Sequence, residues 1–341
     1  MKINVGKRTA ITLTVIVVVA SLIFSSFFYL NLNDESRDEK NSISIAYANF
    51  ESLALFWIAQ DQGFFINSDL NVGSHKYDTG VGSLNAMMKG EADIAVGPSE
   101  FALVGKVMQN ERIKTIGSID KIDFIYLIGR RDRGIDSITD LAGKRVGTTI
   151  GTVSEYYLGR LLNLNGLNMQ NITLVDVRTP VDWVNAVVNG TIDAVVTAQP
   201  YANSAKEALG DNAFVWQAQS NQLQYALMIS TDKWINSHPN LVNSFLKSLL
   251  QAEEFVNDYP TESKAIVKEH MNFTQEYIET VWNQNQYALS LDQSLIAAME
   301  GETRWIITNH LTNETLVPDF RIYIYFDGLR MIKPEAVNII Q

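Results

Sequence analysis

The sequence predicts an α/β fold of two similar lobes, and the main support is a stretch that occurs twice. Residues 85–96 and 185–196 carry Asn, Ala, Gly and Asp at matching positions. In each copy the Gly follows a predicted helix and suits the left-handed conformation that ends it, and the apolar run after the Asp suits a buried parallel strand. One copy alone would be an ordinary helix-to-strand connection of an α/β protein. Each Asp is expected to accept hydrogen bonds from the amides of its own turn.

The segments before the two copies support a duplication. In both, a strand, a helix and a second strand come in the same order before the shared stretch. The first unit has them at residues 44–47, 53–59 and 70–72, and the second at residues 145–147, 156–162 and 172–175. A duplicated α/β unit most simply forms two lobes that face each other, and ligands bind such sheets at the carboxyl ends of the strands.

The N-terminal region is typical of a membrane anchor. Three basic residues precede an uncharged run at residues 9–33, whose apolar centre of about twenty residues would reach roughly 30 Å as a helix. The acidic segment that follows places the N-terminus in the cytoplasm and the rest outside. No small-x-small cleavage site ends the run, so an uncleaved anchor is favoured over a cleaved signal peptide. We therefore expect a cytoplasmic end and anchor at residues 1–33 and a linker at 34–42.

Two apolar runs flank the second unit, at residues 123–129 and 224–230. They are interpreted as paired crossings between the lobes, which makes the second lobe an insertion. From residue 232 the apolar spacing is helical, and these helices are expected to pack on the first lobe. The predicted boundaries are residues 43–127 and 229–341 for lobe 1, with its C-terminal helices, and residues 128–228 for lobe 2.

The candidate ligand contacts lie at the carboxyl ends of strands or in the first turns of helices, where free amides can hold a ligand. Lobe 1 is expected to contribute Asn49, Phe50, Ser52, Gly80, Gly97, Pro98 and Ser99. Lobe 2 is expected to contribute Gly151, Thr152, Ser154, Trp183 and Gln199. The pair Thr152 and Glu155 predicts a capping box, whereas the Lys-Ser/Thr of a phosphate-binding loop is missing.

Composition argues against several classes of function. The chain has 341 residues, a net charge of −11 and no Lys/Arg-rich block after its first residues, so no nucleic-acid partner is expected. It has no cysteine, and its four histidines are scattered, so we expect no metal, no cofactor and no cysteine nucleophile. No Gly-x-Ser-x-Gly is present. Glu51 or Glu100 could still transfer protons, so an enzyme remains the alternative to a binding protein.

The chain resembles the substrate-binding proteins of nitrate, sulfonate and taurine ABC importers over about residues 42–309. The segments that carry the resemblance are residues 49–52, 62–65 and 86–95 in the first lobe and 140–147, 151–154, 190–194 and 199–200 in the second. Family members commonly have Glu-Pro or Asn-Pro at the position of Gln199 and Pro200. They also usually carry a lipid-anchoring cysteine, whose place the N-terminal helix would take.

This resemblance implies a two-lobed periplasmic-binding-protein-like fold of type II with hinge crossings. It implies a monomeric, non-enzymatic protein that captures a small solute outside the cytoplasm and delivers it to ABC permease subunits with a cytoplasmic ATPase. The predicted location is the cell membrane, with a single pass and the binding domain outside. Because the predicted helix N-termini favour an anionic group while no Lys or Arg occurs in the predicted loops, we expect a singly charged small organic anion or zwitterion such as a sulfonate, rather than a divalent anion. Nitrate-like ions, a neutral heterocyclic vitamin precursor, and an enzyme of vitamin or menaquinone pathways on the same fold are the alternatives.

Overall fold

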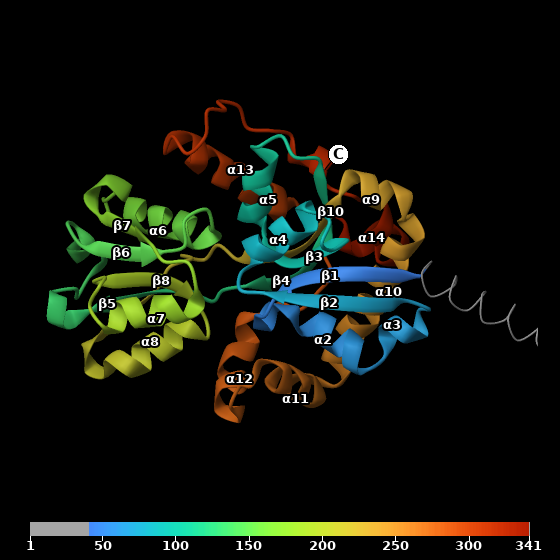
Figure 1. Ribbon diagram of the computed structural model, residues 1–341, viewed down its shortest axis with the longest axis horizontal. Coiled ribbons are helices and arrows are strands. Elements are labelled where there is room, and N and C mark those ends of the chain that lie inside the picture. The colour runs from blue at the N-terminus through green and yellow to red at the C-terminus, as the bar shows by residue number, and fades with distance from the viewer. Residues whose placement is uncertain (1–40, 341) are drawn as a thin grey trace, which may run out of the picture. The chain divides into compact units, whose positions relative to one another are not determined.

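The computed structural model describes residues 41–340, in which two five-stranded sheets form the cores of two lobes (Figure 1). The first sheet has the order β2-β1-β3-β10-β4 and the second the order β7-β6-β8-β5-β9. The first contains β1 (Ser42–Ala48), β2 (Asn71–Tyr77), β3 (Ile94–Ser99), β4 (Ile113–Ile122) and β10 (Gln224–Thr231). The second contains β5 (Ile125–Arg130), β6 (Arg145–Thr148), β7 (Thr173–Asp176), β8 (Ala194–Ala198) and β9 (Ala213–Gln217).

The two sheets have the same topology. In the first, β1 pairs in parallel with β3, and β10 lies antiparallel between β3 and β4. In the second, β6 pairs in parallel with β8, and β5 lies antiparallel between β8 and β9. The strand that enters each sheet from the other lobe therefore takes the same place in both. The predicted duplicated α/β fold is confirmed.

Helices cover both faces of each sheet. Those of the first unit are α2 (Ala54–Asp61), α3 (Phe64–Asn67), α4 (Gly80–Met88) and α5 (Glu100–Val107). Those of the second are α6 (Val153–Leu164), α7 (Pro180–Val188) and α8 (Tyr201–Leu209). In the second lobe α6 lies on one face of the sheet, and α7 and α8 lie on the other (Figure 1). Such two-sided cover explains why the central strands read as continuous apolar runs.

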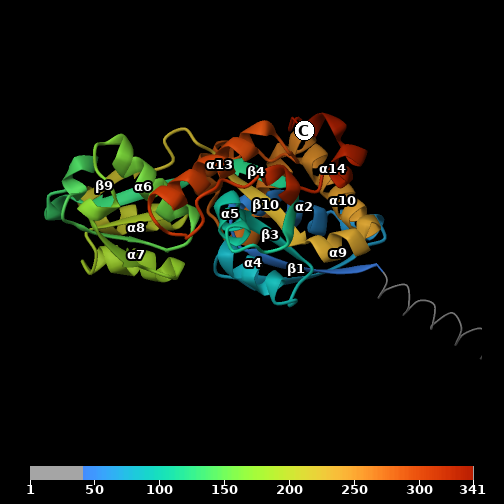
Figure 2. The ribbon, with the colours of Figure 1, turned by 90° about the horizontal axis from the view of Figure 1, so that it is seen from above.

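The C-terminal region is mostly helical. It contains α9 (Asp232–Ser237), α10 (Pro239–Asp258), α11 (Pro260–Met271), α12 (Gln275–Val281), α13 (Gln293–Thr308) and α14 (Asp327–Ile332). The ring of Phe245 in α10 stacks on Phe65 of α3, with 5.7 Å between centroids. Helix α13 lies beside α5 (Figures 1 and 2). Short 3-10 helices occur at Glu51–Leu53, Arg131–Arg133, Ile138–Leu141, Met169–Asn171, Gly210–Asn212, Trp282–Gln284, Phe320–Tyr323 and Pro334–Ala336.

The Asp of the shared stretch accepts hydrogen bonds from other residues than those predicted. Gly90 and Gly190 both have a φ of +79°, as expected for residues that end a helix. The carboxylate of Asp93, however, accepts from the amide of Ser44 at 2.8 Å, and that of Asp193 from the amide of Arg145 at 2.9 Å. The expected bond to its own turn is therefore wrong, because other acceptors already take amides of these turns: backbone carbonyls in the first, and a backbone carbonyl and the Asn189 side chain in the second. Each Asp instead fastens the first strand of its own lobe.

The crossings between the lobes come earlier in the chain than predicted. All of β5 belongs to the second sheet and all of β10 to the first, so the crossings are Asp123–Phe124 and residues 218–223. The boundaries predicted at residues 127/128 and 228/229 need to move accordingly. The apolar runs are the strands that follow each crossing, and they are apolar because both are buried in their sheets.

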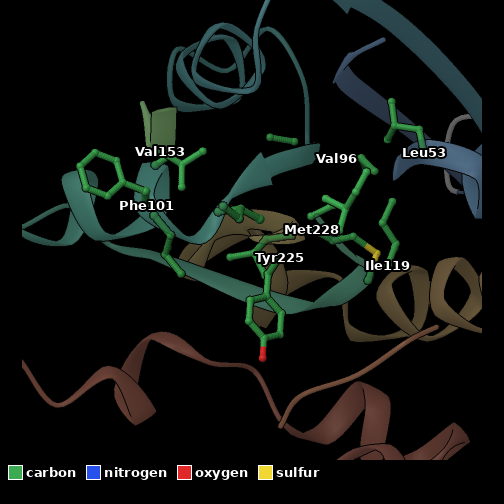
Figure 3. Close-up of a cluster of buried hydrophobic side chains, with 14 of the residues drawn as sticks. Leu53, Val96, Phe101, Ile119, Val153, Tyr225 and Met228 are labelled. Carbon is green, nitrogen blue, oxygen red and sulfur yellow. The ribbon is translucent and has the colours of Figure 1, made fainter. Parts of the chain in front are cut away.

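One hydrophobic cluster contains residues of both lobes. Val153 of α6 lies beside Phe101 of α5 in Figure 3, close to the strand that carries Tyr225 and Met228. Within residues 41–340, no helix is both long and apolar enough to cross a bilayer. The membrane-spanning segment predicted at residues 9–33 lies outside the described residues.

Candidate functional site

A cavity of about 70 Å³ lies where the strand ends of the two lobes meet. We call it the cleft cavity. Its wall is built from loops that follow strands, from the first turns of α4 and α6, from Trp183 of α7, and from the crossing residue Phe124 with the first residues of β5 and β10. The residues that line it are Phe50, Ser52, Thr79, Gly80, Val81, Gly97, Ser99, Phe124, Ile125, Thr152, Val153, Ser154, Trp183, Ala198 and Gln224.

Most of the candidate contacts meet in this cavity. Of the twelve, the eight that line it are Phe50, Ser52, Gly80, Gly97, Ser99, Thr152, Ser154 and Trp183. Asn49 lines a separate cavity of about 300 Å³ that also contains Tyr201. Gly151 lines a third cavity, of about 390 Å³. Pro98 and Gln199 do not line the cleft cavity: Pro98 backs Gly80, and the side-chain oxygen of Gln199 accepts from the backbone amide of Asn203 at 3.1 Å.

The helix start at Thr152 differs from the predicted capping box. The Thr152 hydroxyl donates to the carbonyl oxygen of Thr149 at 2.7 Å, and the Glu155 carboxylate accepts from the amide of Gly151 at 2.7 Å. The capping box is therefore wrong, because Glu155 reaches one residue further back and the Thr152 side chain caps nothing. As a result, no described residue accepts from the amides of Val153 and Ser154, which line the cavity.

The start of α4 leaves a similar pair of donors. The Thr79 hydroxyl caps the helix by accepting from the amide of Gly82 at 3.0 Å. The amides of Gly80 and Val81 have no acceptor in the described part of the chain, and both residues line the cavity. Two helix N-termini thus present unsatisfied N–H groups to one space, which is the usual way in which a protein binds an anion without a cationic side chain.

Aromatic rings supply the apolar wall. The indole of Trp183 is held in place because its N–H donates to the carbonyl oxygen of Val177 at 2.8 Å and to the Thr149 hydroxyl at 3.0 Å. On the other side, Phe50 packs edge to face on Phe124, with 6.1 Å between ring centroids. The cavity therefore combines a polar end with a rigid apolar body, as small-molecule sites commonly do.

Among the residues that the structure describes, no Asp, Glu, Lys or Arg lines the cleft cavity. Glu51 and Glu100, the two candidate carboxylates, are neighbours in the sequence of residues that line the cavity. Both are fully buried. Burial raises the pKa of each to about 8, so both are largely protonated at neutral pH. The carboxylate of Glu100 accepts from the amide of Tyr225 at 2.9 Å. Burial also raises the pKa of Glu302, and the nearby charge of Glu100 raises it further.

Sequence reasoning missed seven residues of the lining, namely Thr79, Val81, Phe124, Ile125, Val153, Ala198 and Gln224. Thr79 had a usable signal, since a Thr before Gly at a helix start is a common N-cap. Phe124 and Gln224 had none, because only the pairing of the two crossings brings them together. Among residues 41–340, no group of three or more His, Asp or Glu side chains is placed to hold a metal ion.

Comparisons with known proteins agree with this architecture. Putative binding proteins of Brucella abortus (strain 2308) and Brucella suis biovar 1 (strain 1330) are 21% identical over 240 residues, which cover 68% of this chain and 72% of theirs. The aliphatic sulphonate binding protein SsuA of Escherichia coli has the same fold, with a TM-score of 0.70, 17% identity, and coverage of 84% of this chain and 92% of its own.

Two further solved structures show the range of proteins with this fold. The alkanesulfonate-binding protein SsuA of Xanthomonas axonopodis pv. citri, bound to MOPS, has a TM-score of 0.72 at 16% identity and covers 84% of this chain and 98% of its own. The desulfurization enzyme DSZB has a TM-score of 0.63 at 14% identity, and the match covers 86% of this chain and 99% of its own. The model of the NMT1/THI5 like family matches residues 51–263. These findings confirm the resemblance predicted from the sequence, and because the family match spans more than half of the chain, this protein belongs to the NMT1/THI5-like family.

Proposed function

We propose that this protein is a solute-binding protein that captures a small organic anion or zwitterion, such as a sulfonate, in the cleft cavity and delivers it to an ABC importer. The observation that carries the proposal is the pair of helix starts, at α4 and α6, whose amides have no acceptor in the described chain and line one neutral cavity. A ligand with several acceptor oxygens on one end and an apolar body on the other matches this lining.

The chemistry favours a single negative charge. A helix N-terminus stabilises an anion by about 0.3–1 kcal/mol at an exposed site and by up to about 2 kcal/mol when partly buried. Hydrogen bonds to a charged group contribute more than neutral ones. No cationic side chain lines the cavity, so a divalent anion would lose more hydration than these amides return.

The same lining argues for capture rather than catalysis. General acid–base chemistry needs a titratable side chain within hydrogen-bond reach of the ligand, and the lining has no Asp, Glu, His, Lys, Tyr or Cys. Glu51 and Glu100 are buried behind it. This distinguishes the proposed role from that of an enzyme with the same fold.

The proposal includes a place in the cell. The apolar run at residues 9–33 would anchor the chain by a single pass in the cell membrane, with both lobes outside the cytoplasm. There the chain, acting as a monomer, would present the ligand-loaded lobes to permease subunits that a cytoplasmic ATPase drives.

Calorimetric titration of the full-length chain tests the ligand class. Ethanesulfonate and taurine are expected to bind, nitrate more weakly, and an uncharged aminopyrimidine not at all. Thermal shift provides a second readout, since a ligand present at 100 times its Kd stabilises the folded state by about 2.7 kcal/mol. Binding of the aminopyrimidine without binding of any sulfonate, carboxylate or small oxyanion would refute the anion proposal.

A backbone substitution tests the contact itself. Val153 is the first residue of α6, and Thr152 before it has an extended conformation with φ −112° and ψ 166°. Proline is well tolerated at such a position, so Val153→Pro removes one N–H while the helix is kept. Sulfonate affinity is expected to fall about tenfold or more. Val153→Ala, which loses side-chain volume but keeps the amide, is the control and is expected to bind nearly as wild type.

A further inference from the structure

A second cavity, of about 390 Å³, adjoins the cleft cavity, and we call it the side groove. The two share Val81 in their linings, and each touches the start of α6, the cleft cavity at Thr152 and the side groove at Gly151. The side groove runs on along α4 and α5, away from the helix N-termini that face the cleft cavity. It therefore borders the proposed site at Val81 and at the start of α6.

The walls of the side groove are mainly apolar. Along α4 they include Val81 and Leu84, and along α5 they include Phe101, residues that recur at the spacing of one helix face. Ile306 of α13 closes another side. Of residues 41–340, Lys106 is the only basic residue in the lining, and Glu155 is the only acidic one. Such a surface suits a hydrocarbon or aromatic body more than a second charged head.

Open space in the side groove reaches the backbone of α5. A methyl group built on Gly105, which lines the groove, would meet no atom within 4 Å. In the cleft cavity the same construction on Gly80 meets the Pro98 Cα at 3.0 Å. The free volume of the combined site thus lies in the side groove rather than around the helix N-termini.

We propose that the ligand is an elongated organic anion, with its head at the amides of α4 and α6 and its apolar body in the side groove. This inference rests on the proposed function and narrows its ligand class. A compact anion occupies the cleft cavity alone and leaves the side groove filled with water. Each methylene that enters the groove is expected to raise affinity about fourfold.

The test is a titration of the full-length chain with straight-chain ethane-, butane- and hexanesulfonate. Wild type is expected to bind hexanesulfonate at least tenfold more tightly than ethanesulfonate. Gly105→Phe places a ring in the groove and is expected to abolish this gain, while ethanesulfonate affinity stays within about twofold of wild type. Gly105→Ala adds only a methyl group where space is open and is expected to keep the gain.

The outcomes separate the two proposals. Normal ethanesulfonate binding shows that Gly105→Phe is folded and that the head site is intact. If that variant also binds hexanesulfonate as wild type does, or if wild type shows no gain with chain length, the side groove takes no part and the elongated ligand is refuted, while the proposed function stands. If wild type binds none of the three sulfonates, the sulfonate reading of the proposed function fails as well.

Discussion

Four carboxyl groups are fully buried and form no salt bridge among the described residues, namely Glu51, Glu100, Asp120 and Glu302. Burial raises the pKa of every one of them. From the sequence, Glu51 and Glu100 are interpreted as carboxyl groups that could transfer protons in an enzyme. The buried position of Glu100 involves residues far along the chain, such as Tyr225, whose amide donates to the Glu100 carboxyl group at 2.9 Å, so local pattern could not reveal it.

We predict that stability falls as the pH rises towards 8. In the folded state the pKa of Glu51 is about 8, compared with an ordinary 4.5, so the folded chain keeps a proton that the unfolded chain releases. Its stabilising contribution is complete below about pH 4.5 and is lost as the pH rises through about 8, at about 1.4 kcal/mol per pH unit.

Urea unfolding at pH 5 and pH 8 measures this effect. Glu51→Gln is expected to lose less stability between these two pH values than wild type, because one buried titrating group has gone. Glu262→Gln, at an exposed glutamate of α11, is the control and is expected to follow wild type. Equal losses for Glu51→Gln and wild type would contradict the prediction.

At the scale of elements, the side chain of Gln219 joins the two crossings. Its carbonyl oxygen accepts from the amides of Phe124 and Ile125 at 2.7 and 2.9 Å. Its NH₂ group donates to the carbonyl oxygens of Ile122 and Gln222, both at 2.9 Å. The strands and helices of both lobes could be predicted from periodicity and duplication. The ends of the crossings could not, since three of these four bonds join residues more than 90 positions apart.

Gln219→Leu is expected to destabilise the protein by at least about 3 kcal/mol, because it removes four hydrogen bonds at the crossings and leaves the amides of Phe124 and Ile125 without a partner in the described chain. Gln219→Glu keeps the acceptor for Phe124 and Ile125 but loses both donors. Hydrogen exchange distinguishes the two variants: the amides of Phe124 and Ile125 should exchange faster in Gln219→Leu and stay protected in Gln219→Glu. Full protection in Gln219→Leu would show that the crossings do not depend on this side chain.

At the scale of the whole described chain, the C-terminal helices contact both lobes, although the sequence predicted packing on the first alone. Tyr277 of α12 donates to Gln199 at 3.3 Å, and the ring of Trp305 in α13 meets Tyr156 of α6 edge to face at 5.6 Å. The sequence showed a helix through Gly159 but no reason for a glycine inside it. The structure supplies the reason, because a β-carbon at Gly159 would lie 2.5 to 2.7 Å from three atoms of the Trp305 ring.

Gly159→Ala should therefore cost stability even though alanine favours a helix by about 1 kcal/mol over glycine. The Trp305 ring must move, and this changes the packing of α13 against α6. The first residues of α6 line the cleft cavity, so the change reaches the proposed site. We expect a lower free energy of unfolding and weaker sulfonate binding, measured by urea unfolding and calorimetry.

Two comparisons isolate this contact from helix propensity. Gly105→Ala makes the same change in a helix where space is open, and should raise stability by up to about 1 kcal/mol. Adding Trp305→Leu to Gly159→Ala removes the ring atoms that the new methyl group meets, so the pair should lose less stability than the sum of the two single changes. If Gly159→Ala is instead as stabilising as Gly105→Ala, the approach of α13 to α6 does not constrain how the lobes meet.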